Sequence, residues 1–280
     1  MIPAVQKDQA LLDDIAATAG DAQALHAWAL GQSGFLLRLA GELLLFDPYL
    51  SDSLTRKYAG TDKEHIRMTE LPAAPEYLTG VRMATSSHNH TDHLDAETLL
   101  PLMKSNPGMT LVIPEANRTF VAERLGCDPA WPAGLDAGES AAVGPWTIHA
   151  APAAHDELER DEQGRCRFLG YIVEGGGWTV FHSGDTRPYP GQEEALRPFN
   201  IDLAFLPING ARPERRVAGN LWGDEAARLA ASLGVGTAVP CHYDMFTFNT
   251  EPTDLFEAAC RDLGQWFRLL GAGERLTLQR

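Results

Sequence analysis

Short apolar runs separated by glycine-containing turns dominate the first part of the chain. Residues 7–18 precede them and carry apolar side chains at helical spacing, which predicts a helix. Three runs of strand length follow at residues 25–30, 35–39 and 42–46. The turns between them predict a β meander. Residues 51–80 are polar and lack periodicity, so we expect a loop or lid there.

Strands and helices alternate through the rest of the chain. Further strands are predicted at residues 81–86, 111–113, 141–143, 147–150, 168–173, 178–182, 201–206 and 237–240. Helices are predicted at residues 115–125, 224–233 and 253–270, and another begins after Asp95 as its N-cap. No repeat or linker divides the chain, so we expect one α/β domain over residues 1–280, with helices facing sheets.

The loop between strand 81–86 and the helix after Asp95 contains an unusual cluster of metal-ligating residue types. Within six residues it holds His88, His90, Asp92 and His93. Side chains alternate along an extended segment, so those of His88 and His90 point to the same side and can bind one ion. Asp92 and His93 follow where the chain begins to turn, and can face a second ion. The alternative is a surface loop that happens to be rich in histidine.

Three more candidate ligands each lie just beyond a predicted strand. They are His155, Asp185 and His242. Strand ends that meet at one edge of packed sheets would bring these side chains to the motif. Taken singly, His155 and His242 would more often be ordinary polar residues. A site for two metal ions needs more ligands than the motif supplies, which favours the metal interpretation.

Charge and cysteine content exclude several classes of protein. The chain has 23 Lys and Arg against 38 Asp and Glu, a formal net charge of −15. Such a chain repels polyanions, so we expect no nucleic-acid partner. Its four cysteines are far apart, which argues against a disulfide framework. The sequence shows neither an export signal nor an apolar run of membrane-spanning length, so we expect a cytoplasmic protein without a membrane partner.

Together these residues resemble the metallo-β-lactamase superfamily, whose fold is a four-layer αββα sandwich. Four stretches are similar to the branch that contains L-ascorbate-6-phosphate lactonase: residues 46–51, 183–186, 206–210 and 241–246. The resemblance implies two ligand sets and one bridging residue. One ion would be held by His88, His90 and His155, and the other by Asp92, His93 and His242, with Asp185 bridging both.

The resemblance implies a metal-dependent hydrolase. Two close cations, zinc or manganese with iron as another option, make hydroxide available for attack on a lactone or ester, such as a phosphorylated sugar-acid lactone. Asp92 and Asp185 are the expected catalytic carboxylates; Asp92 can orient the hydroxide or carry its proton to the leaving group. The alternatives are a phosphodiesterase of the same fold and a metal-stabilised scaffold without turnover. The expected partner is a small molecule, and the sequence leaves a homo-oligomer open.

Several residues outside the ligand set are weaker candidates. Arg187, Asn209 and Tyr243 could bind substrate, with Arg187 holding a phosphate, although loop arginines can simply balance an acidic chain. Asp47 could hydrogen-bond a ligand histidine. His65 is expected to be a solvated loop residue, with a place in the pocket as the alternative.

Overall fold

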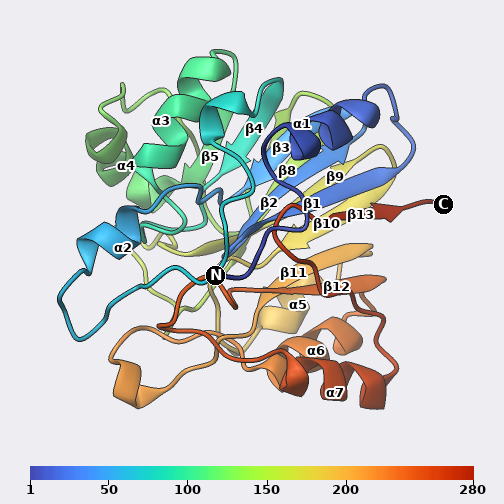
Figure 1. Cartoon of the computed structure of the whole chain (residues 1–280). Coiled ribbons are helices and arrows are strands. Elements are labelled where there is room, and N and C mark those ends of the chain that lie inside the picture. Colours follow the sequence, from blue (N-terminus) through green and yellow to red (C-terminus); the bar gives the residue numbers. More distant parts are fainter.

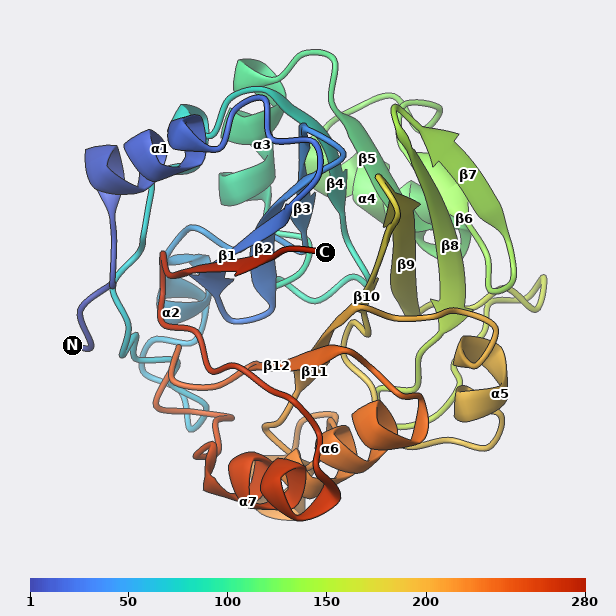
Figure 2. The same cartoon turned by 90° about the vertical axis from the view of Figure 1, so that its right-hand side faces the viewer.

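Two mixed β-sheets pack face to face in the computed structural model, which describes residues 1–280 (Figure 1; Figure 2). The first sheet has the order β13-β1-β2-β3-β4-β5-β6. Its strands are β1 (Leu25–Gly31), β2 (Gly34–Leu39), β3 (Glu42–Phe46), β4 (Val81–Thr85), β5 (Thr110–Pro114), β6 (Ala133–Leu135) and β13 (Arg275–Leu278). The second has the order β12-β11-β10-β9-β8-β7. Its strands are β7 (Ser140–Val143), β8 (Trp146–Pro152), β9 (Leu169–Gly175), β10 (Trp178–His182), β11 (Leu203–Pro207) and β12 (Thr237–Cys241).

Helices cover the outer face of each sheet. The α-helices are α1 (Asp8–Ala17), α2 (Ser53–Lys57), α3 (Ala96–Ser105), α4 (Arg118–Leu125), α5 (Gln192–Leu196), α6 (Gly223–Ser232) and α7 (Asp254–Leu263). Three short 3₁₀ turns are η1 (Pro75–Tyr77), η2 (Glu115–Asn117) and η3 (Pro213–Arg215). Helices α1, α3 and α4 pack on the first sheet, and α5, α6 and α7 on the second (Figure 1). The predicted α/β architecture of sheets between helices is confirmed.

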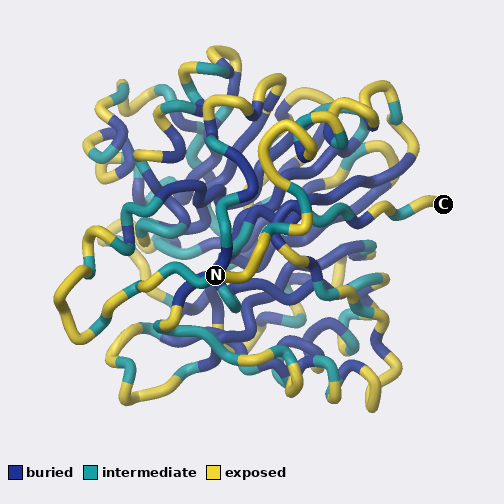
Figure 3. The backbone as a smooth tube through the Cα atoms, in the orientation of Figure 1, coloured by how far each residue is buried: buried dark blue, intermediate teal, exposed yellow.

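Strand alternation explains the layers. In β1, Ala27 faces the core between the sheets, whereas Trp28 faces the helices. In β11, Phe205 faces the same inter-sheet core, and Leu206 packs toward α6 and α7. Both faces of the central strands are therefore buried, and exposed positions gather in the loops and outer helix faces (Figure 3). Burial of each large apolar side chain stabilises the folded state by roughly 1.5–3 kcal/mol. Because the strands are held firmly in this way, the positions of the loops at their ends are fixed as well.

The C-terminal segment differs from the prediction. The expected helix 253–270 is wrong beyond Leu263, because Gly264 takes a left-handed conformation (φ +68) that ends α7. The chain then runs beside β12, where Ala238 donates a backbone hydrogen bond to Trp266 at 2.9 Å. It continues into β13, an unpredicted strand that pairs with β1. Residues 51–80 are mostly irregular as expected, apart from α2 and η1.

No helix combines the length and apolar character that crossing a membrane would require.

Candidate metal centre

The candidate ligands meet at one end of the two sheets. The motif loop follows β4, and His155, Asp185 and His242 follow β8, β10 and β12. Strand β4 is parallel to its neighbours β3 and β5, and β10 is parallel to β11, which is parallel to β12. Parallel neighbours end at the same edge of a sheet, and ligands of α/β folds bind at such edges. The topology therefore gathers side chains that lie up to about 150 residues apart in the sequence.

The gathered side chains form overlapping groups of potential ligands. In each group the candidate donor atoms lie within 4.8 Å of one another. The groups are His88, His90 and His155; His88, His93 and Asp185; and Asp92, His93 and His242. Imidazole nitrogen and carboxylate oxygen together suit zinc, manganese or iron.

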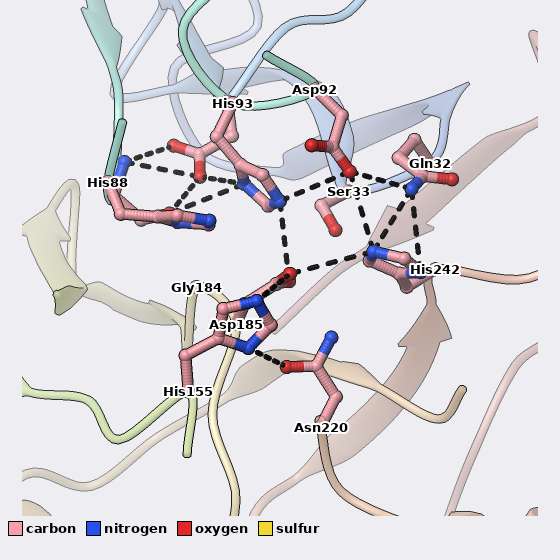
Figure 4. A network of polar contacts seen from close by, with 12 residues as sticks. Gln32, Ser33, His88, Asp92, His93, His155, Gly184, Asp185, Asn220 and His242 are labelled. Carbon is pink, nitrogen blue, oxygen red and sulfur yellow. Dashed lines mark hydrogen bonds and ion pairs between the residues drawn. The ribbon is translucent and has the colours of Figure 1, made fainter. Parts of the chain in front are cut away.

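Asp185 lies between the first and third groups (Figure 4). Its Oδ1 is 3.3 Å from His93 Nε2. Its Oδ2 is 3.5 Å from His242 Nε2 and 3.7 Å from His155 Nε2. One carboxylate thus faces histidines from both groups, the position that a bridging ligand would need.

Three buried polar atoms at the centre of the cluster have no hydrogen-bond partner. They are His88 Nε2, His93 Nε2 and Asp185 Oδ1. Buried polar atoms without partners are destabilising and uncommon in folded proteins. Cations coordinated by these atoms would satisfy all three, so the residues present fit a metal site.

Hydrogen bonds behind the histidines set which ring nitrogen faces the centre. His93 Nδ1 donates to Asp47 at 2.7 Å, and this is the hydrogen bond to a motif histidine that the sequence suggested for Asp47. His155 Nδ1 lies 2.9 Å from the carbonyl oxygen of Gly219 and 3.0 Å from Asn220 Oδ1, both acceptors. The rings of His93 and His155 therefore keep Nε2 free for a cation. Hydrogen bonds to the other ring nitrogen orient metal-binding histidines in many proteins.

Gln32 is a contact that sequence reasoning missed. Its side-chain Nε2 donates to Asp92 Oδ2 at 2.8 Å and lies 3.0 Å from His242 Nε2 (Figure 4). Gln32 sits in the turn between β1 and β2, where its φ is +52. A lone glutamine in a turn carries no sequence signal for such a role, and the same is true of Asn220.

The electrostatics of the cluster favour a cation. Burial lowers the pKa of His90 to about 4 and the pKa of His88 well below its ordinary value, so both rings are neutral near pH 7. Neutral imidazole is the form that binds a metal. Burial also opposes protonation of His93, but the charges of Asp185 and Asp92 outweigh it and raise its pKa well above the usual range. Positive charge is therefore favoured at His93 Nε2, and a metal ion there would replace the proton.

A cavity of about 410 Å³ opens beside the cluster. Its lining includes His90, Asp92, His155, Asp185 and His242. His65 takes the alternative position rather than the expected solvated one: it lines the same cavity and stacks on Tyr58, with ring centroids 4.7 Å apart. Substrate that enters this cavity would reach the candidate metal ligands directly.

The three predicted substrate-binding residues lie outside the lining of this cavity. Arg187 is exposed, and its Nη1 is 3.6 Å from Asp156 Oδ1. Asn209 is fully buried and accepts a hydrogen bond from Asn220 at 2.9 Å. It reaches His155 only through Asn220, which contacts the ring of that histidine. The Tyr243 hydroxyl donates to the carbonyl oxygen of Leu270, and its ring lines a separate cavity of about 350 Å³. Substrate contacts by these residues stay predictions.

The backbone beside Asp185 has no room for a side chain. Gly184 has φ +59, and a Cβ there would lie 2.6 Å from the carbonyl oxygen of Leu169 and 2.7 Å from Ser87 Cβ. We expect Gly184→Ala to lower the free energy of unfolding, measured by urea denaturation, by roughly 1–3 kcal/mol more than Gly164→Ala does. Gly164 also has positive φ (+82), but nothing lies within 4 Å of its Cβ position. Equal losses would contradict the close contact at Gly184.

Comparison with known proteins identifies the family. Residues 43–243 match the model of the beta-lactamase superfamily domain. A UPF0173 metal-dependent hydrolase from Rubrobacter xylanophilus is 30% identical over 245 residues, which are 84% of this chain and 88% of that protein. The chain belongs to the UPF0173 family of metal-dependent hydrolases, within the metallo-β-lactamase superfamily.

Solved structures share the fold of this UPF0173 protein. A possible metal-dependent hydrolase from Veillonella parvula superposes with a TM-score of 0.72 at 18% identity, covering 92% of this chain and 100% of that one. An isothiocyanate hydrolase from Delia radicum gut bacteria superposes with a TM-score of 0.71 at 20% identity, covering 90% of this chain and 98% of that one. The predicted superfamily and its αββα fold are confirmed, whereas the lactonase branch stays a prediction.

Proposed function

We propose that this UPF0173 protein uses two divalent cations to hydrolyse a small-molecule ester or lactone. The observation that carries the proposal is the position of Asp185 between two groups of ligands, one of three histidines and one of Asp92, His93 and His242. Unpartnered buried atoms on both sides of that carboxylate support it. Zinc and manganese fit the mixed nitrogen and oxygen donors best, and iron is a third option.

Two divalent cations held by these residues would lower the pKa of a bound water and would stabilise negative charge on the substrate oxygen. The chain's own residues would position the reactants. Asp92 lines the cavity, and Gln32 holds its Oδ2 by donating a hydrogen bond. Asp92 is therefore oriented to accept a proton from the attacking water and to pass it to the leaving oxygen. Asp185 would hold the two cations at a fixed spacing.

Turnover of a matched panel tests the reaction class. Metal-loaded protein would be assayed with small lactones, aryl esters, an aryl isothiocyanate and aryl phosphodiesters. The isothiocyanate is included because a hydrolase of that substrate shares the fold. We expect the highest kcat/KM for a lactone or ester. Preference for phosphodiesters would make the protein a phosphodiesterase, and no turnover at full metal content would support a non-catalytic scaffold.

Metal content tests the dinuclear centre separately. The seven candidate donors are too many for one tetrahedral ion, so elemental analysis after gentle purification should give close to two equivalents per chain. The control is His149→Ala, since His149 pairs with Glu174 outside the cluster and its loss should leave two equivalents. A maximum of one equivalent, even after reconstitution, would rule out the dinuclear centre.

A further inference from the structure

Three cationic side chains line the cavity beside the metal cluster, in a chain whose net charge is −15. They are Lys57 at the end of α2, Lys63 in the loop that follows, and Arg124 in α4. Arginines elsewhere in the chain commonly face a carboxylate, as Arg187 faces Asp156. The three cavity cations instead make their hydrogen bonds to a hydroxyl and to backbone carbonyls. Their positive charge is therefore not neutralised by a paired carboxylate.

The two lysines keep most of their hydrogen-bonding capacity. Lys57 Nζ donates to Thr91 Oγ1 at 3.2 Å, and Lys63 Nζ donates to the carbonyl oxygen of Arg216 at 2.7 Å. Each ammonium has three N–H donors, so two per lysine are left for a ligand. Arg124 has fewer donors left for a ligand, because its Nη1 donates hydrogen bonds to the carbonyl oxygens of Asn89 and Leu94 in the motif loop.

The contact of Lys57 connects the cationic part of the cavity to the motif loop. Thr91, the partner of Lys57, lies between His90 and Asp92 in the motif. The carboxylates of Asp92 and Asp185 are the acidic groups in the cavity lining, and a metal centre would use both. With cations bound there, the whole cavity would carry excess positive charge, which attracts anions.

Apolar surface lies beside the lysines in the same cavity. Tyr58, Phe120, Phe246 and Phe248 belong to the lining, and Phe120 is 40% exposed. Aromatic rings in the lining of a cavity are typical of a site that binds an apolar group. The cavity thus combines a reactive end, an apolar wall and a cationic wall.

We propose that the substrate carries an anionic group, a carboxylate or phosphate, remote from the bond that is cleaved, and that Lys57 and Lys63 bind it. This inference rests on the proposed hydrolase function and names the substrate class of the same site. It also moves the anion from Arg187, the residue that the sequence suggested, to two lysines in the cavity lining. The body of the substrate would lie against the aromatic wall.

A pair of esters that differ in one charge tests the proposal. Metal-loaded protein would be assayed with 4-nitrophenyl hydrogen glutarate and with its neutral methyl ester. We expect Lys57→Met and Lys63→Met each to lower kcat/KM for the anionic ester by about fivefold, and the double variant by about twentyfold, while the neutral ester is unaffected. Methionine keeps the length of the stem. Lys104→Met, an exposed lysine on α3, is the matched control and should change neither ester.

Binding without turnover separates this proposal from the proposed function. The mono-4-nitroanilide of glutaric acid and its methyl ester would be titrated calorimetrically into the metal-loaded protein and the same variants. We expect the acid to bind more tightly, with a preference that both lysine substitutions reduce. If no ester is cleaved but this preference is present, the hydrolase function is wrong and the anion subsite stands. A 4-phosphonooxybutyrate ester, compared with the carboxylate ester, identifies which anion the lysines prefer.

Three results would overturn the anion subsite. The first is equal binding of the acid and its methyl ester. The second is an equal loss on both esters in the lysine variants, which would make Lys57 and Lys63 structural braces of the loops that they contact. The third is a charge-selective loss in Arg187→Ala with none in the lysine variants, which would return the anion to Arg187.

Discussion

Asp185→Ala is expected to lower kcat/KM by more than about 100-fold, which corresponds to more than about 2.7 kcal/mol of transition-state stabilisation. The carboxylate is 2% exposed and lies 3.3 Å from His93 Nε2 and 3.5 Å from His242 Nε2. It is the one acidic group that faces both ligand groups, so its loss would leave two cations without the negative charge between them. Close cations repel each other strongly in a buried site.

The matched control for Asp185 is His182→Ala. His182 is equally buried and close in sequence, but its Nε2 donates to the carbonyl oxygen of Ser33 at 2.7 Å, and its ring stacks on Phe46. Loss of a group that only supports a ligand costs about 10–100-fold, so His182→Ala should retain more activity. Turnover would be compared at equal bound metal, measured by elemental analysis of the same samples. Equal losses in the two variants would remove Asp185 from the bridging position.

Asp47→Asn is expected to weaken metal binding by about 10–100-fold, mainly at the ion held by Asp92, His93 and His242. Asp47 is fully buried and accepts hydrogen bonds from His93 Nδ1 at 2.7 Å and from Thr85 Oγ1 at 2.7 Å. It also accepts from the backbone and hydroxyl of Ser87. An amide cannot accept all of these bonds, so the free energy of unfolding of metal-free protein should fall by about 1.5–3 kcal/mol as well.

Competition with a chelator measures the metal affinity, and urea denaturation measures the stability. Asp21→Asn is the control, because Asp21 also accepts a hydrogen bond from a histidine, His26, at 3.1 Å, but lies partly exposed before β1. Its substitution should leave metal affinity unchanged and should lower stability by less than about 1 kcal/mol. If Asp47→Asn binds both ions with unaltered affinity, the orienting role assigned to Asp47 is incorrect.

The candidate ligands can be named from the sequence because their signals are local. His88, His90, Asp92 and His93 lie within six residues between a strand and a helix, and backbone geometry alone determines which of them point together. Asp185 and His242 are recognisable because each follows a strand. The position of Asp47 before a proline at the end of β3 likewise suggests its contact with a motif histidine, which the structure contains.

The remaining contacts depend on how distant segments pack. Gln32 reaches Asp92 because the β1–β2 turn meets the motif loop across 60 residues of sequence, and nothing in either segment encodes that approach. The same holds for Lys57 and Lys63, which come from a stretch without periodicity and line the cavity only in the folded chain.

The sequence by itself determined the layered α/β fold and the candidate ligand set of this protein, because strand alternation, helical spacing, the six-residue motif and the ends of strands are set by neighbouring residues. Tertiary structure alone decided the contacts of Gln32 and Asn220 with the candidate ligands, the pairing of β13 with β1, and which cations line the cavity. Arg187 shows the limit: two residues from Asp185 in the sequence, its exposed side chain lies toward Asp156 and outside the cavity lining. Proximity along a chain fixes the backbone, whereas the direction of a loop side chain depends on its packing and charge partners.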